Sequence, residues 1–401
     1  MPARLRVKPK IVFLVHANLY SGAGIERFLL NILRNAPRER FEISVIQGDY
    51  FDRKRVSQAT VESALKGVQS RIIKTFGLGF EKLASNQSLP MYALMQVPEA
   101  LSYSACRLSN QSTLNELVSA DLIYLTKNDD VWLVPRTAKS LIMGSTHTTK
   151  LRFQGNRLRR LLSYLMTAWF TFRYRRIDGF HFHTKQVADH AVVRKNYDII
   201  GLEYGADTRL LFPTLEANSG PVRFLFAGRL EPTKGIGLLL DAWDLMRPSR
   251  AELHIVGSGS LESMVQKRAG KANATFHGQL TDEELYRLYR SCDVFVFPSE
   301  AEIYPLVVLE ALASGLYVIC SDILRGCFDE FEKMQMLEYV PLNASEFCDK
   351  MSKAAESRDN LQRGKIPVHD YIKTNLDWST VTFRLFSEFE RVIAAHARNQ
   401  D

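Results

Sequence analysis

Two basic residues follow a strand-like run in the second half of the chain. Arg229 and Lys234 lie in segment 227–235, directly after the apolar run 223–227. Doubly wound α/β folds bind their ligands where such strands end. Two fixed cations at a strand end suit a diphosphate, because Arg offers a planar fork and Lys a mobile point charge. A solvated pair after a turn explains the same residues, so both interpretations stay open here.

Two carboxylates, Glu302 and Glu310, lie farther along the chain. Glu302 falls in the loop after the apolar run 293–297, and Glu310 falls within a predicted helix at 306–314. A carboxylate accepts hydrogen bonds well from two neighbouring hydroxyls, which a sugar or a ribose diol offers. The alternative is a loop charge and an exposed helix residue. The apolar neighbours of Glu310 favour a functional interpretation there, because an unpaired carboxylate among them is costly.

The predicted helix 306–314 is bracketed by two residues with positional preferences. Pro305 suits the first helical position, and Gly315 suits the C-terminal cap. The backbone amides of Leu306 and Val307 would then lie at the positive end of the helix, where phosphate oxygens bind. The sequence therefore places a phosphate-binding helix start between the two carboxylates.

The remaining pattern positions these residues on parallel sheets. Strand-like runs alternate with helix-length segments, as expected of an α/β protein with helices on both faces of each sheet. Thr281 and Glu284 form a capping box that opens a further helix. Residues 50–120 show poor periodicity, and we expect helices and loops inserted there. The predicted strands are 11–15, 43–46, 122–125, 141–144, 179–183, 223–227, 253–256, 293–297 and 317–320, and further predicted helices are 25–33 and 235–245.

The 401-residue length predicts two domains, because a single core rarely organises so long a chain. We expect an N-terminal Rossmann-like domain at 1–205 and a C-terminal one at 206–378. We also expect a C-terminal helix at about 379–401 that packs back onto the first domain. Pro213 and Gly220 interrupt the pattern at the join.

Charge is divided unevenly between the two halves. Residues 1–205 hold 30 Lys and Arg against 16 Asp and Glu, a net charge of +14, and residues 206–401 carry −6. The bias predicts that one domain meets an anionic partner, and membrane phosphates, a lipid-phosphate acceptor and nucleic acid all fit it.

Cysteines and hydropathy indicate the compartment. The five cysteines lack a CxxC pair, which favours reduced thiols in the cytoplasm and argues against a metal site. The apolar run after the basic N-terminus is too short for a signal peptide, and no apolar stretch reaches the length of a membrane span. We therefore expect a cytoplasmic protein, and a peripheral position on the inner face of the membrane stays open.

In their order and separation these residues resemble the retaining glycosyltransferases of family 4, which have the GT-B fold of two Rossmann-like domains facing each other across a cleft. The resemblance covers nearly the whole chain. It rests on Gly228-Arg229 with Lys234, on the glycine turn 256–259, on segment 276–280, and on the spacing of Glu302 and Glu310.

The resemblance implies that the domain at 1–205 lies on the acceptor side and that the domain at 206–378 binds the nucleotide sugar. It also implies a role for each matched position. Arg229 and Lys234 would hold the donor phosphates, Glu310 the ribose, and Glu302 the hydroxyls of the donor sugar. Gly24, in the segment Ala23-Gly-Ile-Glu-Arg27, would let the backbone approach the donor phosphate or the acceptor, although a helix-start glycine explains it nearly as well. His147 would face the transferred sugar. The implied donor-binding set is Gly24, Gly228, Arg229, Lys234, Gly257, Gly278, Glu302, Leu306, Val307 and Glu310, with Glu302, His147, Arg229 and Lys234 as the catalytic residues.

Three positions depart from the family pattern. Ala23 replaces the first glycine of the N-terminal pair, which leaves the close approach to Gly24. Ile303 and Pro305 stand where the family often has glycines, so the sugar-facing loop is stiffer and lacks the amide donor of residue 305. The replacements at Ile303 and Pro305 bear more on the donor-sugar contacts than on the phosphate site. His181 and His183 alternate along a strand, and we expect packing or surface roles for them.

The hypothesis is a retaining glycosyltransferase that moves a hexose-type sugar from a nucleotide diphosphate sugar to a glycan or lipid-linked acceptor. It needs no metal and no cofactor, because fixed cations and the helix start would stabilise the leaving diphosphate, which would take the proton of the acceptor. The alternatives are an epimerase or a phosphorylase of the same fold, or a non-catalytic nucleotide- or glycan-binding module. The base of the donor stays open, and we expect no nucleic-acid partner.

Segment 150–176 has a composition suited to an anionic membrane surface. It contains eight Lys and Arg and no acidic residue, and an aromatic and apolar run lies between the arginine clusters. A helix of this composition can lie on anionic lipids. An amphipathic helix that packs on the first domain with solvated arginines explains the segment equally well.

Overall fold

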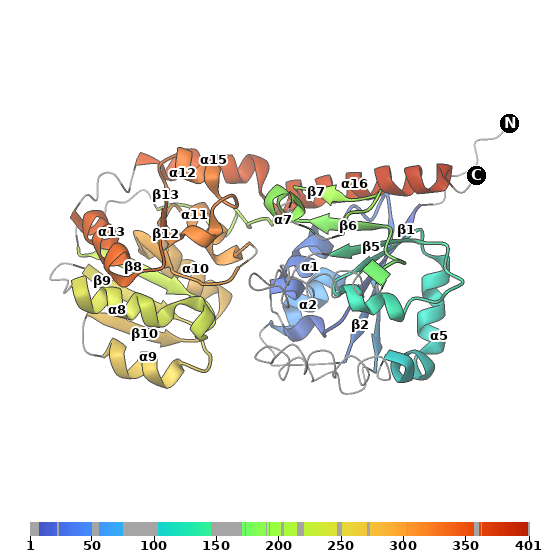
Figure 1. The fold of residues 1–401 in the computed structure, drawn as a ribbon, viewed down its shortest axis with the longest axis horizontal. Helices are drawn as coiled ribbons and strands as arrows, with labels where there is room; N and C mark the ends of the chain where they lie inside the picture. Colours follow the sequence, from blue (N-terminus) through green and yellow to red (C-terminus); the bar gives the residue numbers. More distant parts are fainter. Residues whose placement is uncertain are drawn as a thin grey trace, which may run out of the picture. The chain divides into compact units, whose positions relative to one another are not determined.

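The structure is a computed structural model. It describes residues 8–21, 24–49, 56–74, 103–145, 171–172, 174–189, 191, 193–201, 204–214, 220–246, 251–270, 273–302, 304–356, 361 and 363–399. The chain divides into two compact units, each with its own parallel sheet (Figure 1). The first unit comprises Met1–Leu202 and Thr382–Asp401, and the second comprises Glu203–Val381. The expected division was 1–205 and 206–378.

The described part of the first unit holds a seven-stranded sheet in the order β3-β2-β1-β4-β5-β6-β7, with parallel pairing throughout. Its central strands are continuous apolar runs, as expected for strands buried on both faces. The order reverses at β1, which pairs with β2 on one side and with β4 on the other. The strands are β1 (Lys10–Val15), β2 (Glu42–Gly48), β3 (Gln69–Ile73), β4 (Leu122–Leu125), β5 (Leu141–Ser145), β6 (Gly179–Phe182) and β7 (Ile199–Ile200).

The C-terminal helix α16 (Trp378–Arg398) packs against the sheet of the first unit (Figure 1). The rings of Phe386 and Phe389 lie 6.5 and 6.4 Å from the ring of Phe13 on β1, and Arg40 forms an ion pair with Glu390. The other named helices of this unit are η1 (Leu19–Ser21), α1 (Gly24–Asn35), α2 (Gln58–Leu65), α5 (Gln111–Leu114), η2 (Asn115–Ser119), η3 (Asn128–Trp132) and α7 (Lys185–Asp189).

The described part of the second unit holds a six-stranded parallel sheet in the order β10-β9-β8-β11-β12-β13. Its strands are β8 (Val222–Ala227), β9 (Ala251–Val256), β10 (Ala274–Gly278), β11 (Val294–Phe297), β12 (Tyr317–Ser321) and β13 (Leu337–Val340). Its helices are η4 (Pro232–Lys234), α8 (Ile236–Met246), α9 (Glu262–Ala269), α10 (Asp282–Ser291), α11 (Leu306–Ala313), η5 (Asp322–Leu324), α12 (Asp329–Lys333), α13 (Ala344–Glu356) and α15 (Lys365–Asn375). Both sheets are therefore of the expected doubly wound type.

Local sequence signals set several helix ends as expected. Thr281 caps α10 in a complete capping box with Glu284. Gly315 adopts a φ of +78° after α11, and the amide of Leu316 donates to the carbonyl of Ala311 at 3.0 Å, which closes the helix end. The expectation that Pro305 occupies the first helical position was wrong. Pro305 is the N-cap, with a ψ of 114°, and the first helical residue is Leu306.

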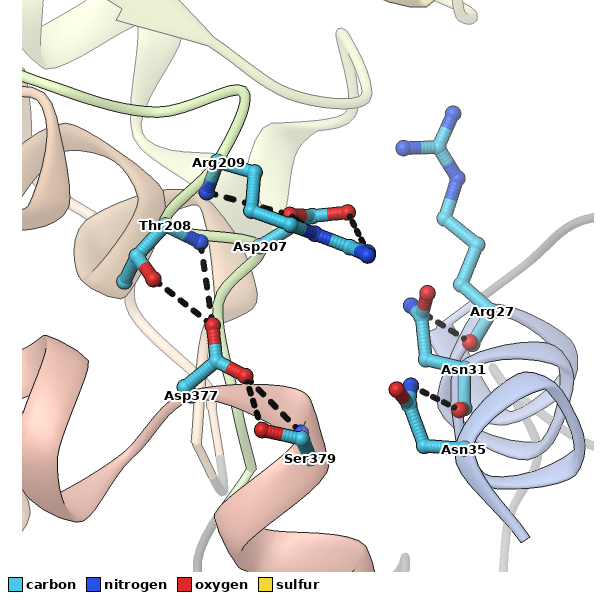
Figure 2. Close-up of polar contacts among 8 residues, drawn as sticks. All are labelled: Arg27, Asn31, Asn35, Asp207, Thr208, Arg209, Asp377 and Ser379. Atoms are coloured by element: carbon cyan, nitrogen blue, oxygen red, sulfur yellow. Dashed lines mark hydrogen bonds and ion pairs between the residues drawn. The ribbon is translucent and has the colours of Figure 1, made fainter.

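Asp377 fastens the two ends of the second unit to each other. Its Oδ2 accepts from the amide and the hydroxyl of Thr208, and its Oδ1 accepts from the amide and the hydroxyl of Ser379 (Figure 2). These bonds lower the pKa of Asp377 although burial opposes the shift. A single carboxylate thus joins the first and last segments of the unit, which lie 169 residues apart.

A polar stripe runs along α1 in the first unit. Asn31 donates to the carbonyl of Arg27 at 3.0 Å, and Asn35 donates to the carbonyl of Asn31 at 2.9 Å (Figure 2). The opposite face of α1 buries Phe28, Leu29, Leu30, Ile32 and Leu33. This division of faces explains why the helix was predictable from the 3.6-residue period.

Gly235 offers a test of how tightly the second unit is built at the end of β8. Its φ is +69°, and a Cβ there would lie 1.8 Å from the carbonyl oxygen of Pro298. We predict that Gly235→Ala lowers the stability of the unit by more than about 2 kcal/mol, because strain and clash add. Gly237→Ala is the matched control, since a Cβ at Gly237 meets nothing within 4 Å. It should be neutral or stabilising by up to about 1 kcal/mol. Thermal unfolding of both variants measures this, and equal melting temperatures would contradict the described loop.

Candidate functional site

Three of the expected glycines come together at the carboxyl ends of β8, β9 and β10. The amide of Gly228 donates to Val256 O at 3.1 Å, and the amide of Gly257 donates to Gly278 O at 2.8 Å. Gly257 has a φ of +140°, and a Cβ there would lie 1.8 Å from Gly228 O. The loops that follow these strands therefore run in direct backbone contact, and only glycine fits at position 257.

The loop after β8 is held on its other side by the loop after β11. The amide of Glu300 and the hydroxyl of Ser299 both donate to Thr233 O, at 2.9 and 3.0 Å. Ser321, at the end of β12, donates its hydroxyl to Ser299 O at 2.6 Å. Hydrogen bonds to backbone carbonyls thus hold the ends of the neighbouring strands β8, β11 and β12 together. We call these strand ends and the loops that follow β8 and β11 the platform, because a binding site needs such a rigid support.

Lys234 and Glu302 form an ion pair on this platform. Their side chains are only 13% and 14% exposed, and Ser299 Oγ, whose single hydrogen can serve either Thr233 O or Glu302, lies 3.2 Å from Glu302 Oε1. Two charges so far withdrawn from water are stable only when paired. The structure therefore brings together the residue expected to hold the phosphates and the residue expected to hold the donor sugar.

Arg229 lies on the same loop with an exposed side chain. The neighbouring carboxylate, Glu231, accepts hydrogen bonds from the hydroxyl and the amide of Ser260. These bonds lower the pKa of Glu231, and the positive charge of Arg229 acts in the same direction. Glu231 is thus hydrogen-bonded to the loop after β9, and the exposed side chain of Arg229 can contact a ligand at the platform.

The N-terminus of α11 follows Glu302 after three residues. Leu306 and Val307 are its first helical residues, and the N-cap Pro305 makes no side-chain hydrogen bond to them. Glu310, one turn farther on, is half-buried and accepts from the Tyr289 hydroxyl at 3.3 Å. The alternative interpretation of Glu310 as an exposed helix residue is therefore wrong, because its side chain is half-buried and hydrogen-bonded.

The other expected site residues belong to the first unit or lie outside the described residues. Gly24 is exposed at the start of α1, and a Cβ there would meet nothing within 4 Å, so the local packing does not require glycine. His147, Ile303 and segment 150–170 lie outside the described residues. His181 and His183 are buried, and the Tyr124 hydroxyl lies 2.8 Å from His181 Nδ1, so His181 packs in the core of the first unit.

Ser299 is the residue of the platform that the sequence analysis missed. Its hydroxyl lies within hydrogen-bond distance of both Thr233 O and Glu302 Oε1, and it is fully buried. Its signal was its position after the apolar strand 294–297 and Pro298, where a small hydroxyl can satisfy loop carbonyls.

Histidines 254 and 277 form a pair on neighbouring strands of the same unit. Their rings stack with centroids 5.2 Å apart, and His254 Nδ1 lies 3.0 Å from His277 Nε2. Burial lowers the pKa of both rings, and for His254 the neighbouring His277 adds to the effect. The neutral pair joins the edge strand β10 to β9.

The described residues contain no group of three or more His, Cys, Asp or Glu side chains that could hold a metal ion. Within the same residues no helix combines the length and the apolar composition needed to cross a membrane.

A comparison with protein families matches most of the second unit. Residues 207–365 match the family model described as glycosyl transferases group 1. This group 1 match contains Arg229, Lys234, Glu302 and Glu310, together with every strand of the second sheet. The first unit lies outside the matched residues.

Curated relatives align over part of the chain. The phosphatidyl-myo-inositol mannosyltransferase of Mycobacterium tuberculosis (strain ATCC 25618 / H37Rv) is 30% identical over 186 residues, which cover 44% of this chain and 49% of the relative. The sulfoquinovosyl transferase SQD2 of Arabidopsis thaliana is 37% identical over 97 residues, or 24% of this chain and 19% of that protein. The matched region thus spans half or less of the length of these relatives.

Solved structures match over almost the whole chain. The sucrose-phosphate synthase of Thermosynechococcus elongatus covers 97% of this chain and is itself covered fully, with a TM-score of 0.70 and 14% identity. Anabaena HepE, solved in complex with UDP and glucose, covers 95% of this chain and is covered to 99%, with a TM-score of 0.67 and 14% identity. These likenesses show the fold: two parallel-sheet α/β domains of the GT-B type.

Proposed function

We propose that the protein is a retaining glycosyltransferase that moves a hexose-type sugar from a nucleotide diphosphate sugar to a glycan or lipid-linked acceptor. The observation that carries the proposal is the paired Lys234 and Glu302 at the joined ends of β8 and β11, within the group 1 match. In the proposed reaction Lys234 would bind a phosphate of the donor, and Glu302 would bind a hydroxyl group of the donor sugar.

The ion pair gives the site a way to exchange partners. Without a donor, Glu302 neutralises Lys234, whose side chain is largely buried. A diphosphate brings more negative charge than one carboxylate, so Lys234 would turn to the phosphate and release Glu302 toward the hydroxyls of the sugar. Donor binding would therefore create the sugar contact.

The leaving diphosphate would be stabilised by charges that are already in place. Arg229 and Lys234 supply cations, and the amides of Leu306 and Val307 supply the positive end of α11. Glu310 would accept hydrogen bonds from the ribose diol. In a retaining transfer the acceptor oxygen bonds to the sugar carbon on the face that the diphosphate leaves, and a phosphate oxygen takes the acceptor's proton. No metal or cofactor has a role in this scheme.

The names of the similar proteins narrow the donors worth testing first. Mannosyltransferases occur among the relatives, and the HepE structures contain UDP. We therefore propose a UDP-linked hexose as the first donor to test, with GDP- and ADP-linked hexoses as the comparisons.

We also propose a cytoplasmic, peripheral location in which segment 150–176 meets an anionic membrane. The described end of this segment supports the idea: Phe172 is 51% exposed, and Arg175 lies 4.3 Å from its ring centre. Burial lowers the pKa of Arg176, and the positive charges of Arg107, Arg136 and Arg175 act in the same direction. Such a cluster suits lipid phosphates.

The phosphate clamp is tested by nucleotide affinity. We predict that Arg229→Ala and Lys234→Ala each weaken binding of the preferred nucleotide diphosphate by about 1.5 to 3 kcal/mol, the usual loss of a charge-assisted bond. Lys333→Ala is the matched control, because Lys333 is an exposed lysine that pairs with Glu330. Calorimetric titration with UDP, GDP and ADP measures the affinities. Unchanged affinity in both variants would show that Arg229 and Lys234 do not hold the phosphates. If the protein binds the nucleotide sugar but neither transfers the sugar nor hydrolyses the donor, the alternative of a non-catalytic binding module is favoured.

The membrane contact is tested by cosedimentation with liposomes. We predict salt-sensitive binding to anionic but not to neutral vesicles, because each basic residue near anionic lipid contributes about 1 kcal/mol. Replacing Arg157, Arg159 and Arg160 by Ser should reduce it and leave nucleotide affinity unaltered. The control replaces Lys267, Arg287 and Lys333 of the second unit by Ser. A wild-type protein that ignores anionic vesicles at low salt would direct the basic surface to a soluble acidic partner.

A further inference from the structure

A buried serine hydroxyl lies between the two loops that carry the paired charges of the platform. Ser299 follows β11 and Pro298, and it is fully buried. Its Oγ lies 3.0 Å from Thr233 O in the loop after β8 and 3.2 Å from Glu302 Oε1 in its own loop. A serine hydroxyl carries one hydrogen, which can serve only one of these acceptors at a time. The hydroxyl of Ser299 therefore has two alternative hydrogen bonds.

Lys234 decides between these two acceptors in the protein without a ligand. Its ammonium group pairs with Glu302 Oε1, the same oxygen that lies near Ser299 Oγ. The positive charge of Lys234 offsets that of the carboxylate, so it weakens the attraction of Oε1 for the serine hydroxyl. The hydroxyl donates to Thr233 O instead. Each of the two acceptors thus has a donor of its own.

The hydroxyl can leave Thr233 O without leaving this carbonyl unpaired. The amide of Glu300 also donates to Thr233 O, at 2.9 Å. The backbone of Ser299 is held separately, because its carbonyl oxygen accepts from the Ser321 hydroxyl at 2.6 Å. Rotation about the Cβ–Oγ bond of Ser299 moves only the hydrogen, and Oγ is already within reach of both acceptors. The change of partner therefore needs no movement of the backbone.

A bound diphosphate would favour the second hydrogen bond, because it draws Lys234 away from Glu302. The carboxylate of Glu302 would then carry an uncompensated charge in a largely buried position, which is costly. Hydrogen bonds to a charged acceptor are stronger than hydrogen bonds to a neutral carbonyl. The Ser299 hydroxyl would therefore turn from Thr233 O to Glu302 as Lys234 leaves.

We propose that Ser299 is a positioning residue for Glu302, and that its hydroxyl passes from Thr233 O to Glu302 when the diphosphate of the donor takes Lys234. The new hydrogen bond holds the carboxylate in place while its other acceptor positions take hydroxyls of the donor sugar. Only hydrogen bonds change in this step, and no proton is transferred. The inference rests on the proposed function, because it gives Ser299 a part in the exchange of partners at that site.

Nucleotide affinity in two backgrounds tests the proposal. Ser299→Ala and Ser299→Cys both remove the hydroxyl, the first with a smaller side chain and the second with a larger one that donates only weakly. In the wild-type background we expect each to weaken binding of the preferred nucleoside diphosphate about fivefold, the factor that corresponds to one net hydrogen bond. In the Glu302→Gln background each should change the affinity by less than about twofold, because residue 302 then has no charge that Lys234 could leave uncompensated. Calorimetric titration of the full chain with UDP, GDP and ADP measures the affinities.

Ser321→Ala is the matched control. It removes another fully buried serine hydroxyl of the platform, but one that bonds to Ser299 O and not to Glu302. Its effect on the affinity should be the same in both backgrounds. If the two Ser299 variants also have the same effect in both backgrounds, the hydroxyl only stabilises the loop, and the proposal is overturned.

Thermal unfolding without nucleotide separates this inference from the proposed function. Since the hydroxyl bonds to Thr233 in the free protein, Ser299→Ala should lower the melting temperature equally in the wild-type and Glu302→Gln backgrounds. A clearly larger loss in the wild-type background would show that the hydroxyl already bonds to Glu302, and would contradict the change of partner. A wild-type protein that binds none of the three nucleotides would instead defeat the proposed function, and the inference with it.

Discussion

The ion pair between Lys234 and Glu302 is the constraint on which the described platform depends. The side chains of Lys234 and Glu302 are each more than four-fifths buried, so both charges have lost most of their contact with water. The ion pair offsets this desolvation energy only while the two side chains stay in contact. Contacts between the two loops keep them there: Gly235 lies against Pro298, and Ser299 bonds to Thr233. The sheet therefore positions the pair through glycine and serine, which leave room for the two loops to touch.

Both units place their polar chemistry at the carboxyl ends of parallel strands. In the second unit these ends carry Lys234, Glu302 and the start of α11, and in the first unit they carry His16 and Asp130. A parallel sheet presents all its strand ends at one edge, so residues distant in sequence meet there without any special packing. The same arrangement thus gathers polar side chains at one edge of each sheet.

The sequence predicted those features that local physics determines. Strands β1, β4 and β11 are continuous apolar runs, and Thr281 and Gly315 are helix-end signals that act within a few residues. Strands β3, β7, β10 and β13 escaped prediction because they are short or half-exposed at and near sheet edges, where apolar periodicity is weak. The Lys234–Glu302 pair spans 68 residues, and spacing along a chain carries no information on such a contact. The contact between His16 and Asp130, which lie 114 residues apart, was missed for the same reason.

The partner exchange of Lys234 is tested most directly by a double-mutant cycle on nucleotide diphosphate affinity. The cycle compares wild type, Lys234→Ala, Glu302→Gln and the double variant by calorimetry of the full chain. If Glu302 competes with the diphosphate for Lys234, Glu302→Gln strengthens binding while Lys234 is present and has a much smaller effect in Lys234→Ala. The expected coupling energy is about 1 kcal/mol or more, as for other contacting pairs. Additive effects of the two substitutions would show that the diphosphate does not take Lys234 from Glu302, and would contradict the account.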